Sequence, residues 1–494
     1  MYDFDKIIDR KNTGSEKHDF KKEYGIPENA IPLWVADMDF SSPAEVIQAL
    51  TERMKHGVFG YTEAKDSYFK AVSSWMQKRH GWQVKPEWLV KTPGVMFAVS
   101  MAVQVFTKPG ESVLIQPPVY HPFARSVLSN NRNLVTNNLV LQNGHYEIDF
   151  DDFEKKIKDN NVKLFIFCSP HNPVGRVWKK EELLKVAEIC MRYNIFVVCD
   201  EIHSDFVYSG SKHIPFAMLS EEIARNCMVC TAPSKTFNVP GLQCSNIFIP
   251  DLQRKKLIED NMVTCALGEI NIAGLTACEA AYTYGEKWLE ELLVYLRSNF
   301  DFIRNYLAKN IPEVKLIYPE GTYLAWLDFR SFMEKADLSQ KELNERLLNK
   351  CGVWLNDGSI FGECGNGFMR MNVASPKSVI EEAMRRLKGP RGTVVKIGVL
   401  RFGQTKEKVF EVTRDDIYVS SINATYMIND NTGYIKVKNF GDNTYMEMLQ
   451  GLSQLSAQGM SNLIVDLRDN SGGYMNSAIM MLNEFLGPDR MIVY

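Results

Sequence analysis

Apolar runs alternate with amphipathic patterns along the first part of the chain. Runs rich in branched apolar residues are bounded by polar or turn-forming residues, as in strands buried on both faces of a sheet. The predicted strands are Val113–Pro118, Lys163–Cys168, Ile195–Asp200 and Met228–Ala232. Between two of them, Glu181–Cys190 has the spacing of an amphipathic helix. Strands that alternate with helices predict a wrapped, mostly parallel α/β sheet.

The pattern changes twice further along the chain. Beyond about Tyr284, a long helical stretch leads to two strand-like segments, Tyr323–Phe329 and Phe368–Asn372, which predict a smaller α+β unit. We expect a site between the large and small units. The second change falls near Gly389, after a helical pattern at Glu381–Lys388. All ten cysteines, eight histidines and eight tryptophans precede Gly389, so the sequence predicts two unrelated modules.

Composition narrows the classes of function. The chain has 57 basic and 60 acidic residues among 494, and it lacks a long basic run, which argues against nucleic acid as a partner. The charged start M-Y-D-F-D-K and the absence of ~18 consecutive apolar residues argue against a signal peptide and a membrane span. We therefore expect a cytoplasmic protein. Several cysteines lie in apolar runs, so we expect buried thiols and no disulfide framework.

Three polar motifs follow one another at the ends of predicted strands. They are C-S-P-H-N-P-V-G with Asn172, C-D-E-I-H with Asp200, and A-P-S-K-T-F-N with Lys235. The spacing leaves room for one strand and one helix between successive motifs, so all three can converge at one sheet edge. A lysine amine can bind the aldehyde of pyridoxal 5′-phosphate (PLP), an aspartate can keep its ring nitrogen protonated, and an asparagine can hydrogen-bond its ring oxygen. Together these motifs predict a PLP site without a metal.

Longer strings carry a family resemblance. They are P-L-W-V-A-D-M-D-F (Pro32–Phe40), Q-P-P-V-Y-H-P-F (Gln116–Phe123), C-S-P-H-N-P-V-G-R-V-W (Cys168–Trp178) and E-G-T-Y-L-A-W-L-D-F (Glu320–Phe329). With them, residues 1–388 resemble fold-type I PLP enzymes and, among these, the MalY/PatB cystathionine β-lyase group of class I/II aminotransferase relatives. The resemblance implies an α/β fold with two domains. A large domain, about 45–285, would hold a mostly parallel seven-stranded sheet, and a small α+β domain would combine the N-terminus with about 286–388.

The resemblance also implies roles for further side chains. Tyr120 would stack on the cofactor ring, with core packing as the alternative. His203 occupies the position of a partner to the ring, although a merely packed histidine is almost as good an interpretation. Arg370 would clamp the substrate α-carboxylate, unless it forms a surface ion pair. Tyr61 would reach the phosphate from the other subunit, so we expect a homodimer with shared active sites.

The phosphate of PLP needs donors of its own. We expect backbone N–H groups at the start of a helical pattern and hydroxyls beside the lysine. These donors are Gly94, Val95 and Met96 for the backbone and Thr231 and Ser234 for the hydroxyls. Gln243 stands where many aminotransferases carry a phosphate-binding arginine, and glutamine here fits the MalY/PatB pattern.

These assignments predict β-elimination. An amino acid would displace Lys235, which would then shuttle the Cα proton, and a thiolate on Cβ would leave. The remaining product would hydrolyse to pyruvate and ammonia, so we expect cystathionine and related cysteine S-conjugates as substrates. An aminotransferase on the same scaffold is the alternative, because the cofactor motifs suit both reactions. A non-catalytic interaction protein would require the motifs to be vestigial.

The second module, 389–494, resembles a fragment of an S41 carboxy-terminal processing peptidase. Gly389–Arg401 resembles the last strands of a PDZ domain, and D-L-R-D-N-S-G-G within Ile464–Gly473 resembles a loop near an oxyanion site. The sequence stops at Tyr494 before any S-A-x-E-like nucleophile segment. No histidine or suitably spaced lysine follows Ser471, so we interpret it as a turn serine and do not expect peptidase activity.

Overall fold

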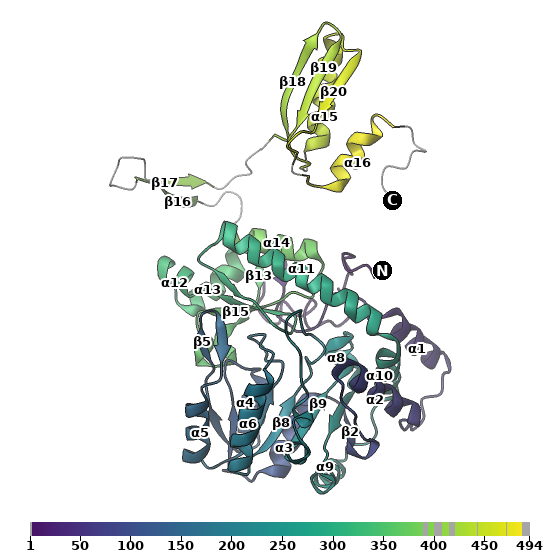
Figure 1. Ribbon diagram of the computed structural model, residues 1–494, viewed down its shortest axis with the longest axis vertical. Helices are drawn as coiled ribbons and strands as arrows, with labels where there is room; N and C mark the ends of the chain where they lie inside the picture. The colour runs from purple at the N-terminus through teal and green to yellow at the C-terminus, as the bar shows by residue number, and fades with distance from the viewer. Residues whose placement is uncertain are drawn as a thin grey trace. The chain divides into compact units, whose positions relative to one another are not determined.

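The computed structural model describes residues 2–388, 394–399, 408–413, 420–441, 443–470 and 472–486 (Figure 1). The chain divides into two compact units, Met1–Pro390 and Arg391–Tyr494. Within the described residues, no helix is both long enough and apolar enough to cross a membrane. Each unit has its own sheets and its own hydrophobic clusters.

The first unit is built on a seven-stranded sheet. In spatial order its strands are β2 (Leu89–Thr92), β10 (Ser245–Phe248), β9 (Cys227–Thr231), β8 (Phe196–Asp200), β7 (Val162–Cys168), β3 (Ser112–Ile115) and β4 (Asn133–Thr136). Strand β10 is antiparallel to both of its neighbours, and the other pairs are parallel. The predicted mostly parallel seven-stranded sheet is confirmed.

Alternate residues of each strand belong to two separate cores. Val198 packs in the core on one face, with α3 (Val95–Phe106), α4 (Pro122–Ser129) and α9 (Leu252–Thr264). Val197 packs in the core on the other face, with helices α5 (Phe150–Asp159), α6 (Lys180–Arg192) and α10 (Ile272–Tyr284). If a strand shifted by one residue against its neighbour, its side chains would exchange the two cores. The packing therefore fixes the strand register, and with it the position of the residues at each strand end.

The smaller sheet of the first unit is antiparallel. Its order is β11 (Lys315–Ile317), β12 (Leu324–Asp328), β15 (Phe368–Asn372) and β14 (Asn356–Asp357). The long helix α11 (Glu286–Asn310) packs on β11 and on α14 (Lys377–Lys388). The N-terminal strand β1 (Ile31–Pro32) pairs in parallel with β13 (Val353–Trp354). This arrangement confirms the small α+β part and joins the N-terminal segment to it.

The remaining helices and strands of the first unit are short or peripheral. They are α1 (Ala44–Lys55), α2 (Asp66–His80), the hairpin β5 (Val140–Gln142) and β6 (His145–Glu147), α7 (Glu221–Arg225), α8 (Pro233–Thr236), α12 (Arg330–Ala336) and α13 (Gln340–Glu345). The predicted strand Val113–Pro118 is too long at its end, because Pro117 and Pro118 lack the N–H that a ladder needs. The predicted strand Phe368–Asn372 matches β15 at both ends.

The second unit contains two small sheets. Strands β16 (Val394–Val399) and β17 (Lys408–Thr413) pair antiparallel, and the other sheet has the order β18 (Ile422–Asn429), β19 (Thr432–Val437), β20 (Asn462–Asp466). Helices α15 (Thr444–Ala457) and α16 (Met475–Asn483) complete a core that, among the described residues, buries Ile435, Val437, Met448, Leu455 and Met481. Much of the predicted PDZ-like string Gly389–Arg401, apart from β16, lies outside the described residues, and so does Ser471.

Candidate active site

The three motif residues lie at or shortly after the carboxyl ends of neighbouring parallel strands. Asp200 is the last residue of β8, Asn172 follows the end of β7 by four residues, and Lys235 lies in α8 directly after β9. Strands β7, β8 and β9 are adjacent and parallel, so their ends meet at one edge of the sheet. Charge interactions join Asp200 to Lys235 across this edge.

The amine of Lys235 is held by a main-chain carbonyl. Its Nζ donates to the oxygen of Ala36 at 2.7 Å. Burial lowers the pKa of Lys235 to about 8, with Arg370 adding to that effect, while Asp37 and Asp200 oppose it. At pH 7 about a tenth of such amines is neutral, against less than about a thousandth for an ordinary lysine. A neutral amine is what nucleophilic attack on an aldehyde requires.

Asp200 is a buried carboxylate with few donors. Its Oδ1 accepts from the backbone N–H of Ile202 at 3.1 Å, and within the described residues it forms no ion pair within 4 Å. Burial raises the pKa of Asp200 to about 7. A cationic ring nitrogen would supply the partner that this buried carboxylate lacks.

Arg370 is a buried cation at the other side of the site. It lies on β15, where Nη2 donates to the oxygen of Trp34 at 2.8 Å and Nη1 to Oδ1 of Asn172 at 3.1 Å. Its Nε has no hydrogen-bond partner within the described residues, and burial lowers the pKa of Arg370 to about 10. Because a buried guanidinium without a carboxylate is costly, the group is suited to an anionic ligand.

Aromatic and imidazole rings surround this polar centre. Tyr120 is half-buried, 5.6 Å from the ring of His121 and 5.7 Å from that of Phe123. His203 is buried, its Nδ1 has no hydrogen-bond partner in the described part of the chain, and burial lowers its pKa to about 3. It is therefore neutral at physiological pH. The ring of Tyr323 lies 5.7 Å from His203.

The predicted phosphate donors cluster at the start of α3 and around α8. Gly94 precedes α3 in an extended conformation, and a Cβ added to it would meet nothing within 4 Å. The backbone at Gly94–Met96 is therefore open to a ligand at the helix N-terminus. Ser234 is half-buried in α8, whereas the hydroxyl of Thr231 donates to the oxygen of Asn246 at 2.9 Å.

Tyr61 lies apart from these residues within one chain. It is fully exposed in the segment between α1 and α2. Among the described residues no hydrogen bond or ring contact joins Tyr61 to the groups above, so its contribution to the site of another subunit stays a prediction.

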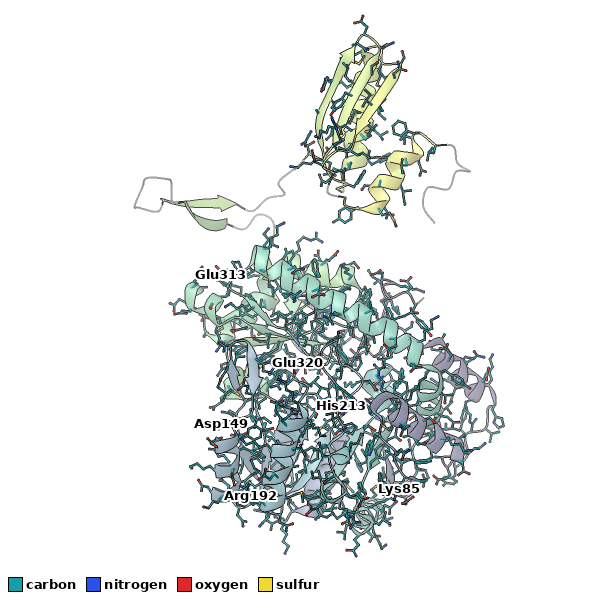
Figure 2. All side chains as sticks on the ribbon, viewed as in Figure 1. Lys85, Asp149, Arg192, His213, Glu313 and Glu320 are labelled. Atoms are coloured by element: carbon teal, nitrogen blue, oxygen red, sulfur yellow. The ribbon has the colours of Figure 1, made fainter. Side chains whose placement is uncertain are left out.

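An ion-pair network fixes the loop that carries Asn172. The buried Arg176 contacts Glu182 at 2.8 Å and Glu320 at 2.9 Å, and Glu320 also accepts from the backbone of Val177. Glu320, which is labelled in Figure 2, is half-buried and lies three residues before Tyr323. The network thus ties the end of the large sheet to the small sheet.

Sequence reasoning missed two groups that contact the site. The carbonyl of Ala36 accepts from Lys235 and also from the hydroxyl of Tyr323 at 2.8 Å. Both residues lie in strings that mark the family resemblance. A backbone acceptor leaves no signal in residue type, but a tyrosine within the apolar run Tyr323–Phe329 is a signal that could have been used.

The donors and acceptors fit PLP. A half-buried, partly neutral lysine, a buried aspartate with few hydrogen-bond donors and an open helix N-terminus match the aldehyde, ring nitrogen and phosphate of that cofactor. Arg370 remains for a carboxylate.

Comparison with known proteins agrees with this geometry. Residues 28–387 match the family aminotransferase class I and II, and residues 431–494 match peptidase family S41. The chain is 45% identical to the cystathionine beta-lyase PatB of Bacillus subtilis, over 78% of this chain and 98% of that protein. A PLP-bound putative aminotransferase from Clostridium difficile 630 is 44% identical, with a TM-score of 0.76 over 79% of this chain and 99% of that one. Cystalysin from Treponema denticola, which contains PLP, is 38% identical, with a TM-score of 0.75 over 78% and 98% of the two chains.

This chain belongs to the class I and II aminotransferase family, and its first unit has the fold-type I architecture of PLP-dependent enzymes. Within the family, its close homologues are the cystathionine β-lyases and C–S lyases of the MalY/PatB group. The predicted family, fold class, cofactor and enzyme class are thereby confirmed, and so is the S41-like segment at the end of the chain.

Proposed function

We propose that the chain cleaves the C–S bond of cystathionine or another cysteine S-conjugate by PLP-dependent β-elimination, releasing a thiol, pyruvate and ammonia. The observation that carries the proposal is the pair formed by a half-buried, partly neutral Lys235 and a buried Arg370 that has no carboxylate partner among the described residues. Arg370 would bind the α-carboxylate of an amino acid, and the amino group would take the place of Lys235 on the cofactor aldehyde. The names of the homologous lyases support the same reaction.

We assign the cofactor contacts residue by residue. When bound, PLP supplies an electron sink for the carbanion formed at Cα. Lys235 would bind its aldehyde, and Asp200 would keep its ring nitrogen protonated. Asn172 would hydrogen-bond its ring oxygen. The further contacts would be Tyr120 and His203 at the ring and Gly94, Val95, Met96, Thr231 and Ser234 at the phosphate.

The chain's own groups would then manage the substrate. Arg370 would orient the α-carboxylate, which places the Cα–H bond near Lys235. The freed amine of Lys235 would accept the Cα proton. Its lowered pKa suits proton transfer near neutral pH, because a base works best when its pKa is close to the working pH.

We also propose the assembly and the division of labour. Two chains would form a homodimer in which Tyr61 of each reaches the phosphate of the other, consistent with its full exposure here. Residues 1–388 would carry the activity, with a large domain at about 45–285 and a small domain formed by the N-terminus and about 286–388. Residues 389–494 would be a passenger that contains the end of a PDZ domain and an S41-like fragment.

A direct assay separates the lyase from the alternative, an aminotransferase. The alternative is tested because one similar solved structure is described as a putative aminotransferase. Purified protein saturated with PLP would be given cystathionine without any keto acid. We expect stoichiometric pyruvate, ammonia and thiol. If cystathionine yields no pyruvate and is consumed only when a keto acid is added, the lyase proposal is wrong and the aminotransferase takes its place.

A further inference from the structure

The segment Val35–Asp39 contacts Lys235 through the carbonyl of Ala36. Its backbone is held from two sides by asparagine side chains. Asn372 donates to the oxygens of Val35 and Asp37 at 2.6 Å each. Asn238 accepts from the N–H of Met38 at 3.0 Å and donates to its oxygen at 3.1 Å. The Ala36 carbonyl, which accepts from Lys235, sits in the middle of this clamped segment.

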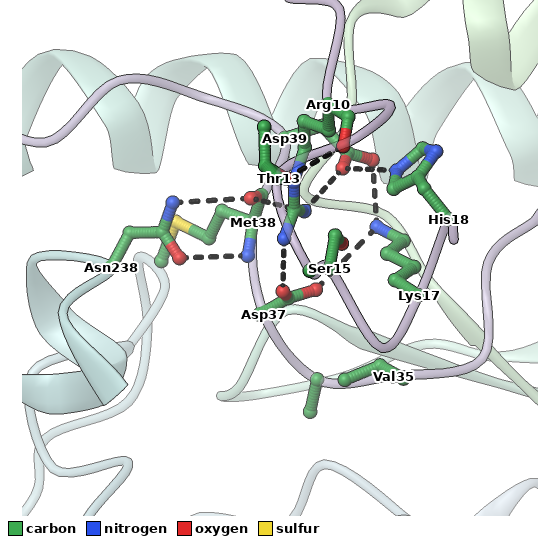
Figure 3. Close-up of polar contacts among 12 residues, drawn as sticks. Arg10, Thr13, Ser15, Lys17, His18, Val35, Asp37, Met38, Asp39 and Asn238 are labelled. Atoms are coloured by element: carbon green, nitrogen blue, oxygen red, sulfur yellow. Dashed lines mark hydrogen bonds and ion pairs between the residues drawn. The ribbon is translucent and has the colours of Figure 1, made fainter. Parts of the chain in front are cut away.

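The two carboxylates of the segment are bound by cations from the N-terminal residues (Figure 3). Arg10 bridges them, with 2.6 Å to Asp37 and 2.8 Å to Asp39. Lys17, whose side chain is 0% exposed, lies 2.6 Å from Asp39 and 3.9 Å from Asp37. His18 approaches Asp39 at 3.2 Å. We call Arg10, Lys17, His18, Asp37 and Asp39 the N-terminal charge cluster.

The basic side chains of the cluster stabilise the charged form of Asp39. Burial alone would raise the pKa of Asp39, but Lys17, His18 and Ser375 hold it well below its usual range. Asp37 also acts on the site, because its charge opposes the lowering of the Lys235 pKa more strongly than that of Asp200 does. Any change in the cluster therefore reaches the Lys235 amine through Asp37 and through the Ala36 carbonyl.

We propose that Arg10 and Lys17 are positioning residues for Lys235. They fix Asp37 and Asp39, and through the intervening backbone they fix the carbonyl and the charge that hold the lysine amine in place. The inference rests on the proposed role of Lys235 in binding PLP and moving the Cα proton. Its physical basis is that a displacement of about 1 Å at a reacting group can cost about 100-fold in rate.

The matched control is Lys21, on the same N-terminal segment. It is also buried, and its Nζ donates to the oxygen of Glu28 at 2.7 Å. Within the described residues no hydrogen bond or ion pair joins Lys21 to Val35–Asp39. Lys21→Met should therefore weaken the anchoring of the N-terminal residues without altering the N-terminal charge cluster.

The primary measurement is the pH titration of the visible absorbance of PLP bound to Lys235, which requires cofactor binding but no turnover. The charged groups acting on that lysine are Asp37, Asp200 and Arg370. Arg10→Gln removes a cation and leaves Asp37 less neutralised, so we expect the midpoint to rise by about one pH unit. Asp37→Asn should lower it, and Lys21→Met should leave it unchanged.

Two further measurements complete the test. With cystathionine, we expect kcat of Arg10→Gln to fall about 10- to 100-fold with little change in KM, and Arg10→Lys to recover much of the loss. Thermal unfolding of each variant, compared with Lys21→Met, separates loss of fold from loss of position. If Arg10→Gln does not fold, the shift of the absorbance titration midpoint in Asp37→Asn tests the proposal instead. Midpoints of Arg10→Gln or Asp37→Asn equal to that of Lys21→Met would overturn the proposal, whether or not the protein is a lyase.

Discussion

The main sheets of the two units differ in how much of their strands is buried. In the Met1–Pro390 unit, β8 and β9 are buried at every residue, with helices on both faces. In the Arg391–Tyr494 unit, the central strand β19 buries only alternate residues, and of its two neighbours β18 has no buried residue and β20 has only Asp466. Packing locks the polar side chains at the strand ends of the first unit, and preorganised geometry of this kind is what catalysis needs. The comparison assigns all of the proposed chemistry to the first unit.

The sharpest way to break this assignment is to remove Lys235. Lys235→Ala should abolish both the visible absorbance of bound PLP and the release of pyruvate, because no other described lysine is held at the end of β9. Absorbance spectra and a pyruvate assay at saturating PLP provide the measurement, with Lys335→Ala, an exposed ion-pair lysine, as the matched control. Turnover that survives Lys235→Ala would rule out the assignment.

The next largest effect is expected at Asp200. Asp200→Ala should weaken PLP binding and slow Cα proton removal by about two to three orders of magnitude, because an unprotonated ring is a poorer electron sink. Exchange of the Cα proton with deuterated solvent measures the step directly. Near-normal exchange at saturating PLP would show that Asp200 does not hold the ring nitrogen.

Mixing inactive chains tests whether the first unit needs a second copy. Lys235→Ala and Tyr61→Ala chains should each be inactive, yet hybrid dimers would contain one intact site. At equal amounts and random pairing, about half of the dimers are hybrids, so activity should recover to about a quarter of the wild-type value. No recovery after demonstrated subunit exchange would count against a shared site.

A smaller effect is expected on the stability of the cofactor-free protein. Burial raises the pKa of Asp200 to about 7 from 3.8, so its folded state binds the proton more tightly than its unfolded state. This contribution is fully present below about pH 4 and is lost as pH rises to about 7. Asp200→Asn mimics the protonated form, so it should exceed the wild type by about 1 to 4 kcal/mol at pH 8. Denaturant unfolding at pH 4 and pH 8 measures this, and equal differences at both pH values would contradict it.

The sequence predicted the parts of the site that residue type and strand ends define. Asn172, Asp200 and Lys235 could be proposed because they lie at or shortly after the ends of apolar strands, and the structure places these three strands side by side. The Ala36 carbonyl and the N-terminal charge cluster were not found. Arg10 and Asp37 are 27 positions apart and lie in no strand or helix, so only the folded chain shows that they meet. Periodicity predicted sheets and faces, but not contacts between irregular segments.

The smallest effect on activity is expected when the second unit is removed. The first unit completes its core with α14, in which Ile380, Ala383 and Met384 are buried, and every proposed site residue precedes Lys388. A chain that ends at Lys388 should therefore keep full PLP binding and lyase activity.

Solubility should change more than activity on this truncation. The second unit exposes about half of Ile428, Ile464, Leu467 and Phe485, and β20 is an edge strand of its sheet. Apolar side chains beside an unpaired edge favour association between chains. The chain ending at Lys388 should therefore stay monodisperse at higher concentration, as light scattering would show, while kcat and KM stay within about twofold of the full chain. A large loss of activity would instead mean that the first unit needs the second for its activity. The second unit would then not be a passenger.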